Sequence, residues 1–370
     1  MHLSTRTTAA LAAATGALVL ATTGAAGAAS SSSGGAAAGA AHPWSRTLND
    51  TVLAPFQIAL NRGHVYYTDG FAGTVSRVRP GDDEVVASVQ GEIAGVELTP
   101  DGRTMAYAAS TQAGTSLTIR RAGRPDVVAD LSGYEDAANP DGHRTYGVQG
   151  PASQCAKDFF AQVSGGPATY TGIKESHPYQ VAYLGRGSWA VADAAGNDVL
   201  RVRPDGRVST LAVLPKQPVR ITRAMATELG APDCVVGVTY AFEPVPTDVE
   251  RDQHGDLWVS TLPGGPEDGS LGKRGSVYRI SPDGAVSRFA TGFLSATNLA
   301  VTPGGTLYVT ELFGGQVTQV FRHHKTAKLT LERPVSVEVL GRSLYVGQLA
   351  DADPETGEVH APGSIQVFRR

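Results

Sequence analysis

Carboxylate and amide side chains stand near the ends of several short apolar runs in this sequence, where packing alone asks for nothing polar. Asp248 and Asn298 lie near the starts of TDVERD and TNLAVT, while Asp69 and Glu311 close HVYYTD and TLYVTE. Such oxygen ligands suit a hard cation such as calcium, which takes about 6 to 8 oxygens in proteins. A metal site built from these four residues is the first chemical hypothesis, and calcium is the only cofactor that they suggest.

The same residues also have a purely structural interpretation. Asp or Asn at the start of a strand often accepts hydrogen bonds from nearby backbone N–H groups and does nothing more. A water-filled channel also tolerates carboxylates without an ion. The sequence leaves both interpretations open for Asp248.

A second set of polar residues is expected on the same face of the fold as ligand-binding groups: His177, Asp193, Thr261 and Gln348. Glu175 could act as a base beside His177, but no neighbouring residue supplies a nucleophile. The sequence contains no G-x-S-x-G, P-loop, H-E-x-x-H or C-x-x-C motif. We therefore assign no catalytic residue and expect binding rather than catalysis, although a metal-dependent hydrolase needs only an ion, a water and a base.

The elements that position these residues recur along the chain. Six segments each combine a short apolar run, a turn containing glycine, and a second run rich in aromatic or β-branched residues. The six segments are FQIALNRGHVYYTD, AGVELTPDGRTMAYAA, YQVAYLGRGSWAVAD, TDVERDQHGDLWVST, TNLAVTPGGTLYVTE and VSVEVLGRSLYVGQ. Most continue into alternating stretches on either side of a Pro-Asp-Gly-like turn, which indicates a further hairpin. Four antiparallel strands repeated six times predict an all-β, six-bladed β-propeller.

The last unit, which ends in SIQVFRR, has only three strands. We expect residues 45–53 to supply its outer strand and close the ring, because closure removes exposed sheet edges. Three insertions are expected at about 134–176, 216–244 and 262–274. Short helices are predicted in LSGYEDAANPDG, where Ser132 and Glu135 have capping-box spacing, and in ASQCAKDFFAQV and TRAMATELG.

The insertions and the candidate residues should share one face. In a propeller the first strand of each blade lines the central channel and the second runs back antiparallel to it. The starts of first strands and the ends of second strands therefore lie together. We call this the insertion face, because all three insertions should also open onto it.

Cys155 and Cys234 are the only two cysteines of the chain. A lone pair in an exported protein favours a disulfide. The two residues lie in the insertions that flank the third unit, so the bond would tie those insertions into one lid.

The N-terminus has the pattern of an export signal. Arg6 precedes an apolar run from about Ala9 to Leu20 and then small residues, which predicts a signal peptide over 1–28. Residues 29–43 are interpreted as a Ser/Gly/Ala linker, and 44–370 as the propeller. No apolar run is long enough for a membrane span, and with a net charge of −4 no basic patch suggests nucleic acid. We expect a secreted monomer.

Several segments together resemble the secreted ScyD/ScyE family of bacterial propellers. They are VVADLSGYEDAANPDG, SHPYQV, VADAAGNDVLRV, STLAVLP and PTDVERDQHGDLWVSTLPGGPEDGSLGKRGSVYRISPDG. The resemblance covers nearly all of 44–370 and implies fold and export, but no particular activity. The first unit departs from the Gly-rich start of many members.

More remotely, the blades are similar to gluconolactonase-like and NHL-type propellers. The gluconolactonase-like group holds a divalent ion with a Glu, an Asn and an Asp at channel-facing positions. Asp248 and Asn298 occupy comparable strand starts, in the reverse chain order.

These observations predict a secreted propeller that binds a ligand or has a structural role, without catalysis. One alternative is a calcium-dependent, lactonase-like hydrolase with an axial metal site. The other is a protein-interaction scaffold of the cell envelope. The partner would be a small molecule or an envelope protein.

Overall fold

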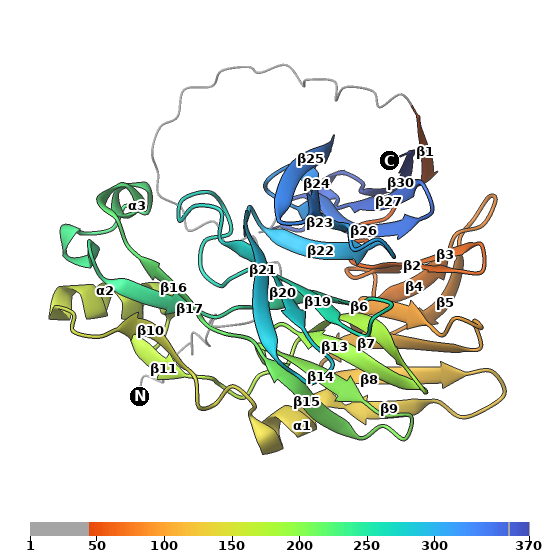
Figure 1. Ribbon diagram of the computed structural model, residues 1–370, viewed down its shortest axis with the longest axis horizontal. Coiled ribbons are helices and arrows are strands. Elements are labelled where there is room, and N and C mark those ends of the chain that lie inside the picture. The colour runs from red at the N-terminus through yellow and green to blue at the C-terminus, as the bar shows by residue number, and fades with distance from the viewer. Residues whose placement is uncertain (1–43, 354–355, 370) are drawn as a thin grey trace, which may run out of the picture.

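Six four-stranded antiparallel sheets surround a central axis as the blades of a propeller (Figure 1). The structure, a computed structural model, describes residues 44–353 and 356–369. The predicted signal peptide and linker, 1–28 and 29–43, lie outside the described residues. In the first five blades the strands follow chain order from the axis outward. The prediction of a six-bladed β-propeller is confirmed.

The strands of the six blades have the following bounds. Blade 1 consists of β2 (Ile58–Asn61), β3 (His64–Asp69), β4 (Thr74–Arg77) and β5 (Glu84–Ser88). Blade 2 consists of β6 (Gly91–Leu98), β7 (Thr104–Thr111), β8 (Gly114–Arg121) and β9 (Val127–Asp130). Blade 3 consists of β12 (Pro178–Gly185), β13 (Ser188–Asp193), β14 (Asp198–Val202) and β15 (Val208–Val213). Blade 4 consists of β18 (Pro246–Arg251), β19 (Leu257–Thr261), β20 (Gly275–Ile280) and β21 (Val286–Phe293). Blade 5 consists of β22 (Ala296–Val301), β23 (Leu307–Glu311), β24 (Gln316–Phe321) and β25 (His324–Thr330). Blade 6 consists of β26 (Pro334–Leu340), β27 (Ser343–Gln348), β30 (Ser364–Arg369) and β1 (Ser45–Asn49).

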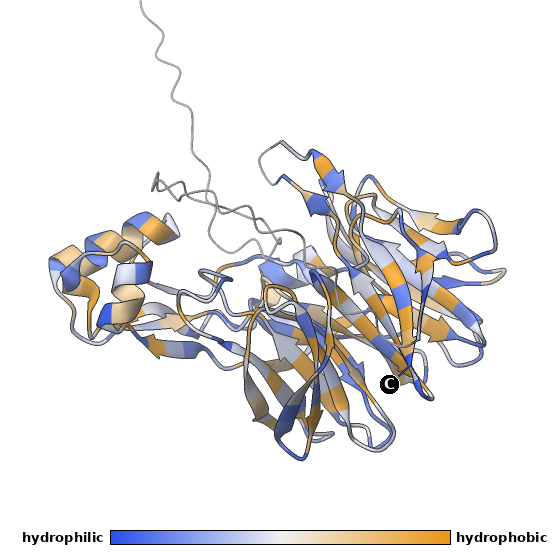
Figure 2. Ribbon diagram, turned by 90° about the horizontal axis from the view of Figure 1, so that it is seen from above, coloured by the Kyte–Doolittle hydropathy of each residue, from blue (hydrophilic) through white to orange (hydrophobic). Residues whose placement is uncertain are grey.

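Local sequence explains the hairpins. In the turn between β2 and β3, Arg62 and Gly63 have φ of 49° and 83°. Positive φ at both central residues defines a type I′ turn, whose twist matches that of the flanking strands. Along the blades, hydrophobic and hydrophilic residues alternate, as orange and blue in Figure 2, so each strand presents one apolar side to a neighbouring sheet.

Apolar side chains fill the space between neighbouring blades. Trp189 of blade 3 packs with Leu117 of blade 2, and Trp258 of blade 4 packs with Leu299 of blade 5. Burying one large apolar side chain stabilises the fold by about 1.5–3 kcal/mol relative to leaving it exposed. The packed interfaces make the ring a rigid frame for its inner strands.

The N-terminal strand closes the ring as predicted. β1 pairs antiparallel with β30, with Arg46 opposite Val367, and becomes the outer strand of blade 6. A small two-stranded sheet, β28 (Asp351–Ala352) with β29 (Val359–Ala361), interrupts this blade.

The first two insertions form a separate four-stranded sheet that the sequence analysis missed. Its order is β11-β10-β17-β16. The strands are β10 (Thr145–Gln149), β11 (Thr169–Thr171), β16 (Gln217–Arg220) and β17 (Thr239–Phe242), accompanied by α2 (Gln154–Ser164), α3 (Arg223–Glu228) and the 3₁₀ helix η1 (Asp233–Val235). We call residues 145–171 and 217–242 the insertion subdomain. It stands to one side of the blades and not across their axis (Figures 1 and 2).

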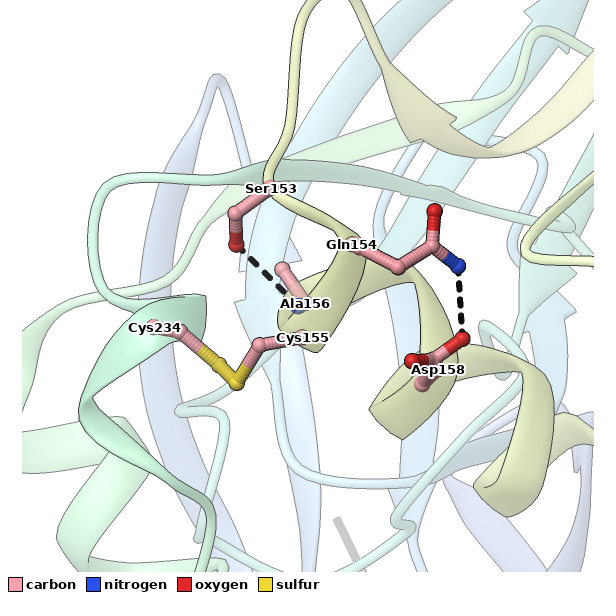
Figure 3. Close-up of a disulfide and its surroundings, with 6 residues drawn as sticks. All are labelled: Ser153, Gln154, Cys155, Ala156, Asp158 and Cys234. Atoms are coloured by element: carbon pink, nitrogen blue, oxygen red, sulfur yellow. Dashed lines mark hydrogen bonds between the residues drawn. A yellow bond between two sulfur atoms is a disulfide. The ribbon is translucent and has the colours of Figure 1, made fainter.

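The subdomain has its own apolar core and its own crosslink. Phe160 and Tyr240 pack with ring centroids 4.7 Å apart. Cys155 at the start of α2 is bonded to Cys234 in η1, which confirms the predicted disulfide (Figure 3). The third insertion docks the subdomain on blade 4, because the Arg274 guanidinium lies 4.6 Å from the centre of the Phe242 ring.

All three predicted helices are present. The first, α1 (Leu131–Ala138), links blade 2 to the subdomain. Its cap is Asp130, which accepts a hydrogen bond from the Gly133 backbone N–H at 2.8 Å. The prediction that Ser132 caps this helix is therefore wrong, because the chain already turns helical directly after β9. None of the helices in 44–353 and 356–369 has the length and apolarity of a membrane span.

Candidate functional site at the propeller axis

The inner strands bring one aligned position of each blade to the axis, and its side chain is polar in five of the six blades. These strands are sheet edges, so their free backbone groups need partners. The polar ring, as we call it, consists of Gln57, Gly95, Gln180, Asp248, Asn298 and Ser336, all of them buried. Asp248 and Asn298 therefore lie in neighbouring blades of one ring.

Backbone N–H groups occupy the oxygens of Asp248. Its Oδ1 accepts from Val249 N at 2.7 Å, and its Oδ2 accepts from Leu299 N of the next blade at 2.8 Å. Asn298 repeats the pattern, because its Oδ1 accepts from Val337 N of blade 6 at 2.7 Å. Burial raises the pKa of Asp248 well above its usual range, against the lowering effect of the two N–H donors. These contacts tie blade 4 to blade 5 and blade 5 to blade 6.

The rest of the polar ring joins other blades in the same way. Gln57 Oε1 accepts from Val96 N at 2.7 Å and from Val181 N at 3.3 Å. Gly95 is needed for close approach, since a Cβ there would lie 2.3 Å from the Tyr179 carbonyl oxygen. The contacts of the polar ring thus support the structural interpretation of these strand starts.

An apolar plug lies next to the polar ring, on the insertion-face side. It is one buried cluster with members from blades 1, 2, 3, 5 and 6. Its members are Ala54, Phe56, Ala94, Tyr179, Ala194, Leu312, Val335 and Leu349. All are at most 6% exposed, so the cluster is closed to solvent.

On the other side of the polar ring, three glutamates form an acidic ring. Glu97, Glu250 and Glu338 come from blades 2, 4 and 6, and the matching positions of blades 1, 3 and 5 are Ala59, Ala182 and Ala300. The glutamates are partly exposed whereas the alanines are buried. The sequence analysis missed this ring, although the residue after each aligned apolar position alternates between Ala and Glu.

The glutamates act on one another electrostatically. Burial, and then the charges of Glu338 and Asp248, raise the pKa of Glu97 to about 8 despite a hydrogen bond from Leu98 N. Burial raises the pKa of Glu338 to about 7, and burial with the charge of Glu338 raises the pKa of Glu250 well above its usual range. All three residues lie on inner strands, so their carboxylates are near the axis. Such a group can share protons or attract a cation.

Asp69, Asp193 and Glu311 hold the segments that lead into their own blades. Asp69 accepts from Leu53 N at 2.8 Å and Ala54 N at 3.0 Å. Equivalent bonds join Asp193 Oδ1 to His177 N at 2.7 Å and Glu311 Oε2 to Leu294 N at 2.7 Å. Within 44–353 and 356–369, no three His, Cys, Asp or Glu side chains stand round a common point as metal ligands.

The other predicted ligand-binding residues are distributed around the insertion face. His177 Nε2 lies 2.7 Å from Glu92 Oε1 of blade 2. Burial lowers the pKa of His177, but the hydrogen bond and charge of Glu92 outweigh that effect and raise it. Thr261 Oγ1 accepts from Gln217 of the subdomain at 3.1 Å, and Gln348 donates to the Glu332 carbonyl at 2.9 Å. These residues lie on different blades and share no contact.

Comparisons with known proteins support the fold. No family model and no curated protein matches the chain. A gluconolactonase structure from Xanthomonas campestris is 13% identical, with a TM-score of 0.53 over 88% of this chain and 89% of that one. A structure described as a putative glucose dehydrogenase, from Thermus thermophilus, is 16% identical, with a TM-score of 0.51 over 88% and 99%. A protein of unknown function from Bacteroides thetaiotaomicron is 11% identical, with a TM-score of 0.52 over 88% and 75%.

At these identities the similarity shows the fold alone. The class that fold and topology define is the six-bladed β-propeller, here with an inserted, disulfide-linked subdomain.

Proposed function

We propose that the chain is an extracytoplasmic binding protein of the ScyD/ScyE type, in which the propeller is the scaffold and the insertion subdomain contacts the partner. One observation carries the proposal. The subdomain has its own sheet, core and disulfide and projects from the ring, whereas the polar ring is occupied by bonds between blades. The polar groups of the axis are thus committed to the fold, and the subdomain is the part added to it.

An envelope protein is the partner that the subdomain suits best. Its terminal strands, β11 and β16, each have one edge unpaired within the described chain, and such edges can accept an extended segment of another protein. The outer surface of α2 also exposes Val163, which is 62% accessible. We take the free strand edges as the docking element and Val163 as a surface position at which to test it.

Capture from an envelope extract tests this proposal. The full chain is immobilised, and the captured proteins are compared with those captured by Val163→Glu and by Val128→Glu. Val128 is a matched control, because it is 63% exposed on blade 2, away from the subdomain. We expect Val163→Glu to lose a partner that Val128→Glu retains. Equal capture by both variants, or no specific capture, would count against the subdomain as the binding element.

The competing proposal is a calcium-dependent hydrolase that uses Asp248, Asn298, Glu311 and Asp69. The acidic ring favours it, because it adds negative charge beside Asp248 in a water-accessible part of the axis. Lactone hydrolysis that requires calcium and disappears in Asp248→Asn would support this alternative. Hydrolysis at the background rate would dismiss it.

A further inference from the structure

Four oxygen-bearing side chains lie near the junction where α1 leaves blade 2 and β14 begins in blade 3. Glu135 lies on α1, Asn139 and Asp141 follow that helix, and Asp198 is the first residue of β14. We call these four residues the junction cluster. None of them belongs to an inner strand, so the cluster is separate from the rings at the axis.

The junction cluster contains buried oxygens that accept no hydrogen bond. Asp141 and Asp198 are fully buried and Glu135 is 2% exposed. The unpartnered atoms of the cluster are Glu135 Oε1, Asn139 Oδ1, Asp141 Oδ1 and both carboxylate oxygens of Asp198. Buried polar atoms nearly always have a partner, and a buried charge without one is strongly unfavourable. Five such oxygens at one junction call for a proton or a cation as their partner.

The backbone brings these carboxylates together. Asp198 lies directly opposite Asp193 in the pairing of β13 with β14, and cross-strand neighbours have Cβ atoms about 5 Å apart. Asp193 is satisfied by the Ser176 hydroxyl and the His177 N–H, both within hydrogen-bond distance. Asp198 has no equivalent donor.

Asp141 is fixed beside the same strand pair. Its Oδ2 accepts from Asn197 Nδ2 at 3.0 Å and from the Tyr146 hydroxyl at 2.9 Å, while Oδ1 has no partner. A Cβ at Gly172 would lie 1.8 Å from that Oδ1, so only glycine leaves room for the carboxylate. Asn139 Nδ2 donates to the Gly172 carbonyl at 3.2 Å, which leaves the amide oxygen available.

The charges of the cluster are mutually repulsive. Burial, followed by the charges of Asp193, Glu135 and Asp141, raises the pKa of Asp198 well above its usual range. Burial and the charges of Asp193 and Asp141 raise the pKa of Glu135 to about 8. Geometry shows that two of these carboxylates are close, because a Cβ at Gly196 would lie 3.3 Å from the carboxylate carbon of Asp193 and 3.5 Å from Asp198 Oδ1.

Basic side chains surround the cluster without entering it. His143 and Arg144 lower the pKa of Asp141, and Lys174 lowers that of Glu135, but these effects are smaller than the effect of burial. Lys174 Nζ donates to the carbonyl of Asp136 and not to a cluster oxygen. None of these basic groups is hydrogen-bonded to an unpartnered oxygen of the cluster, and Arg144 Nε is itself buried without a partner.

We propose that the junction cluster binds one hard divalent cation, calcium by preference, through the carboxylates of Glu135, Asp141 and Asp198 and the amide oxygen of Asn139. Because no three acidic side chains of the described chain already surround a common point, binding requires the Glu135 and Asp198 side chains to turn toward the ion. Calcium tolerates such irregular oxygen sets and adds backbone carbonyls and water. The ion would lock α1, and with it the subdomain's point of attachment, to blade 3. This inference does not rest on the proposed binding function.

Calcium titration of the full chain tests the proposal. After treatment with EDTA and its removal, CaCl₂ is titrated at pH 7.5 by calorimetry, and the melting temperature is recorded in EDTA and in calcium. We expect one ion per chain, with a Kd of about 1 mM or tighter, as in extracellular modules, and a higher melting temperature in calcium. No binding of calcium at 10-fold above that limit, roughly 10 mM, would overturn the proposal.

Two variants locate the ion. Asp198→Asn keeps the shape of the side chain and should weaken calcium binding by about 10-fold to 100-fold, while its melting temperature in EDTA stays at or above that of the wild type. Binding equal to the wild type would overturn the assignment. If Asp198→Asn does not fold, Glu135→Gln on the helix side of the cluster serves the same purpose, with the same two outcomes.

Two controls separate this site from others. Asp205→Asn, on the exposed turn after β14, should leave binding unchanged. Glu338→Gln, in the acidic ring, should also leave it unchanged. Loss of binding in Glu338→Gln with binding retained in Asp198→Asn would place the ion at the axis and overturn the proposal.

Discussion

The polar ring and the junction cluster bury the same chemical group with opposite local support. Both oxygens of Asp248 receive a backbone N–H, and one of these donors belongs to the next blade. Both oxygens of Asp198 receive none, although that residue is equally buried. A buried carboxylate that has donors holds a fold together, whereas one that lacks them needs a proton or a cation. The difference separates a structural acid from a candidate ligand without reference to function.

The largest predicted change in stability follows from removing Asp248, the carboxylate that accepts two backbone hydrogen bonds. Asp248→Ala leaves Leu299 N and Val249 N without their acceptor at the axis, and should destabilise the chain by about 3 kcal/mol. Urea unfolding measures this loss, which we expect to be the same in EDTA and in calcium. A loss of stability that appears only in calcium would make Asp248 an ion ligand. Asp248 and Asp198 would then no longer differ in role.

A smaller effect concerns the acidic ring. Its glutamates are partly exposed, unlike the fully buried Asp248 and Asp198. Folded-state pKa values of about 8 for Glu97 and about 7 for Glu338 exceed the usual glutamate pKa of 4.5. Between pH 4.5 and about pH 8 the folded state therefore binds more protons than the unfolded state. This stabilisation is fully present below about pH 4.5 and is lost as the pH rises through 7 to 8.

Glu338→Gln tests whether the three glutamates of the acidic ring repel one another. Removing one charge from the ring should stabilise the chain by about 1 kcal/mol at pH 8, after allowance for solvent screening, and change little at pH 5. Chemical denaturation at the two pH values measures the difference. Equal effects at both would mean that the three glutamates do not repel one another.

The smallest effect is expected where a carboxylate has a cationic partner. The raised pKa of His177 gives stability that is present below its unfolded value of 6.5 and is lost as the pH rises through the folded value. Glu92→Gln should therefore cost about 0.5–1 kcal/mol at pH 6 and nothing measurable at pH 9. The NMR titration of the His177 ring provides the check, and an unshifted midpoint in the variant would contradict this role of Glu92.

The fold could be predicted because its information is local and repeated. Six copies of one strand–turn–strand pattern specify six hairpins, and closure by β1 follows from the three-stranded last unit. The insertion sheet was missed because β10 pairs with β17, about ninety residues later, and each strand is too short for a clear alternation. Pairing of that kind depends on tertiary contact and not on pattern.

The sites were predicted less well than the fold, for a related reason. The sequence placed Asp248 and Asn298 correctly in one ring but could not reveal that backbone N–H groups fill their oxygens. Glu135 and Asp198 were visible within distinctive segments, yet nothing in the pattern indicates that two residues 63 positions apart are both buried at one junction. Which side chains from different blades come together is evident only from the folded propeller.

The most direct test compares the calcium dependence of unfolding in three proteins: wild type, Asp198→Asn and Asp248→Asn. We predict that calcium raises the free energy of unfolding of the wild type and of Asp248→Asn by equal amounts, and leaves Asp198→Asn unchanged. A calcium response that survives in Asp198→Asn and disappears in Asp248→Asn would contradict the account, because the paired acid would then be the ligand and the unpaired one would not.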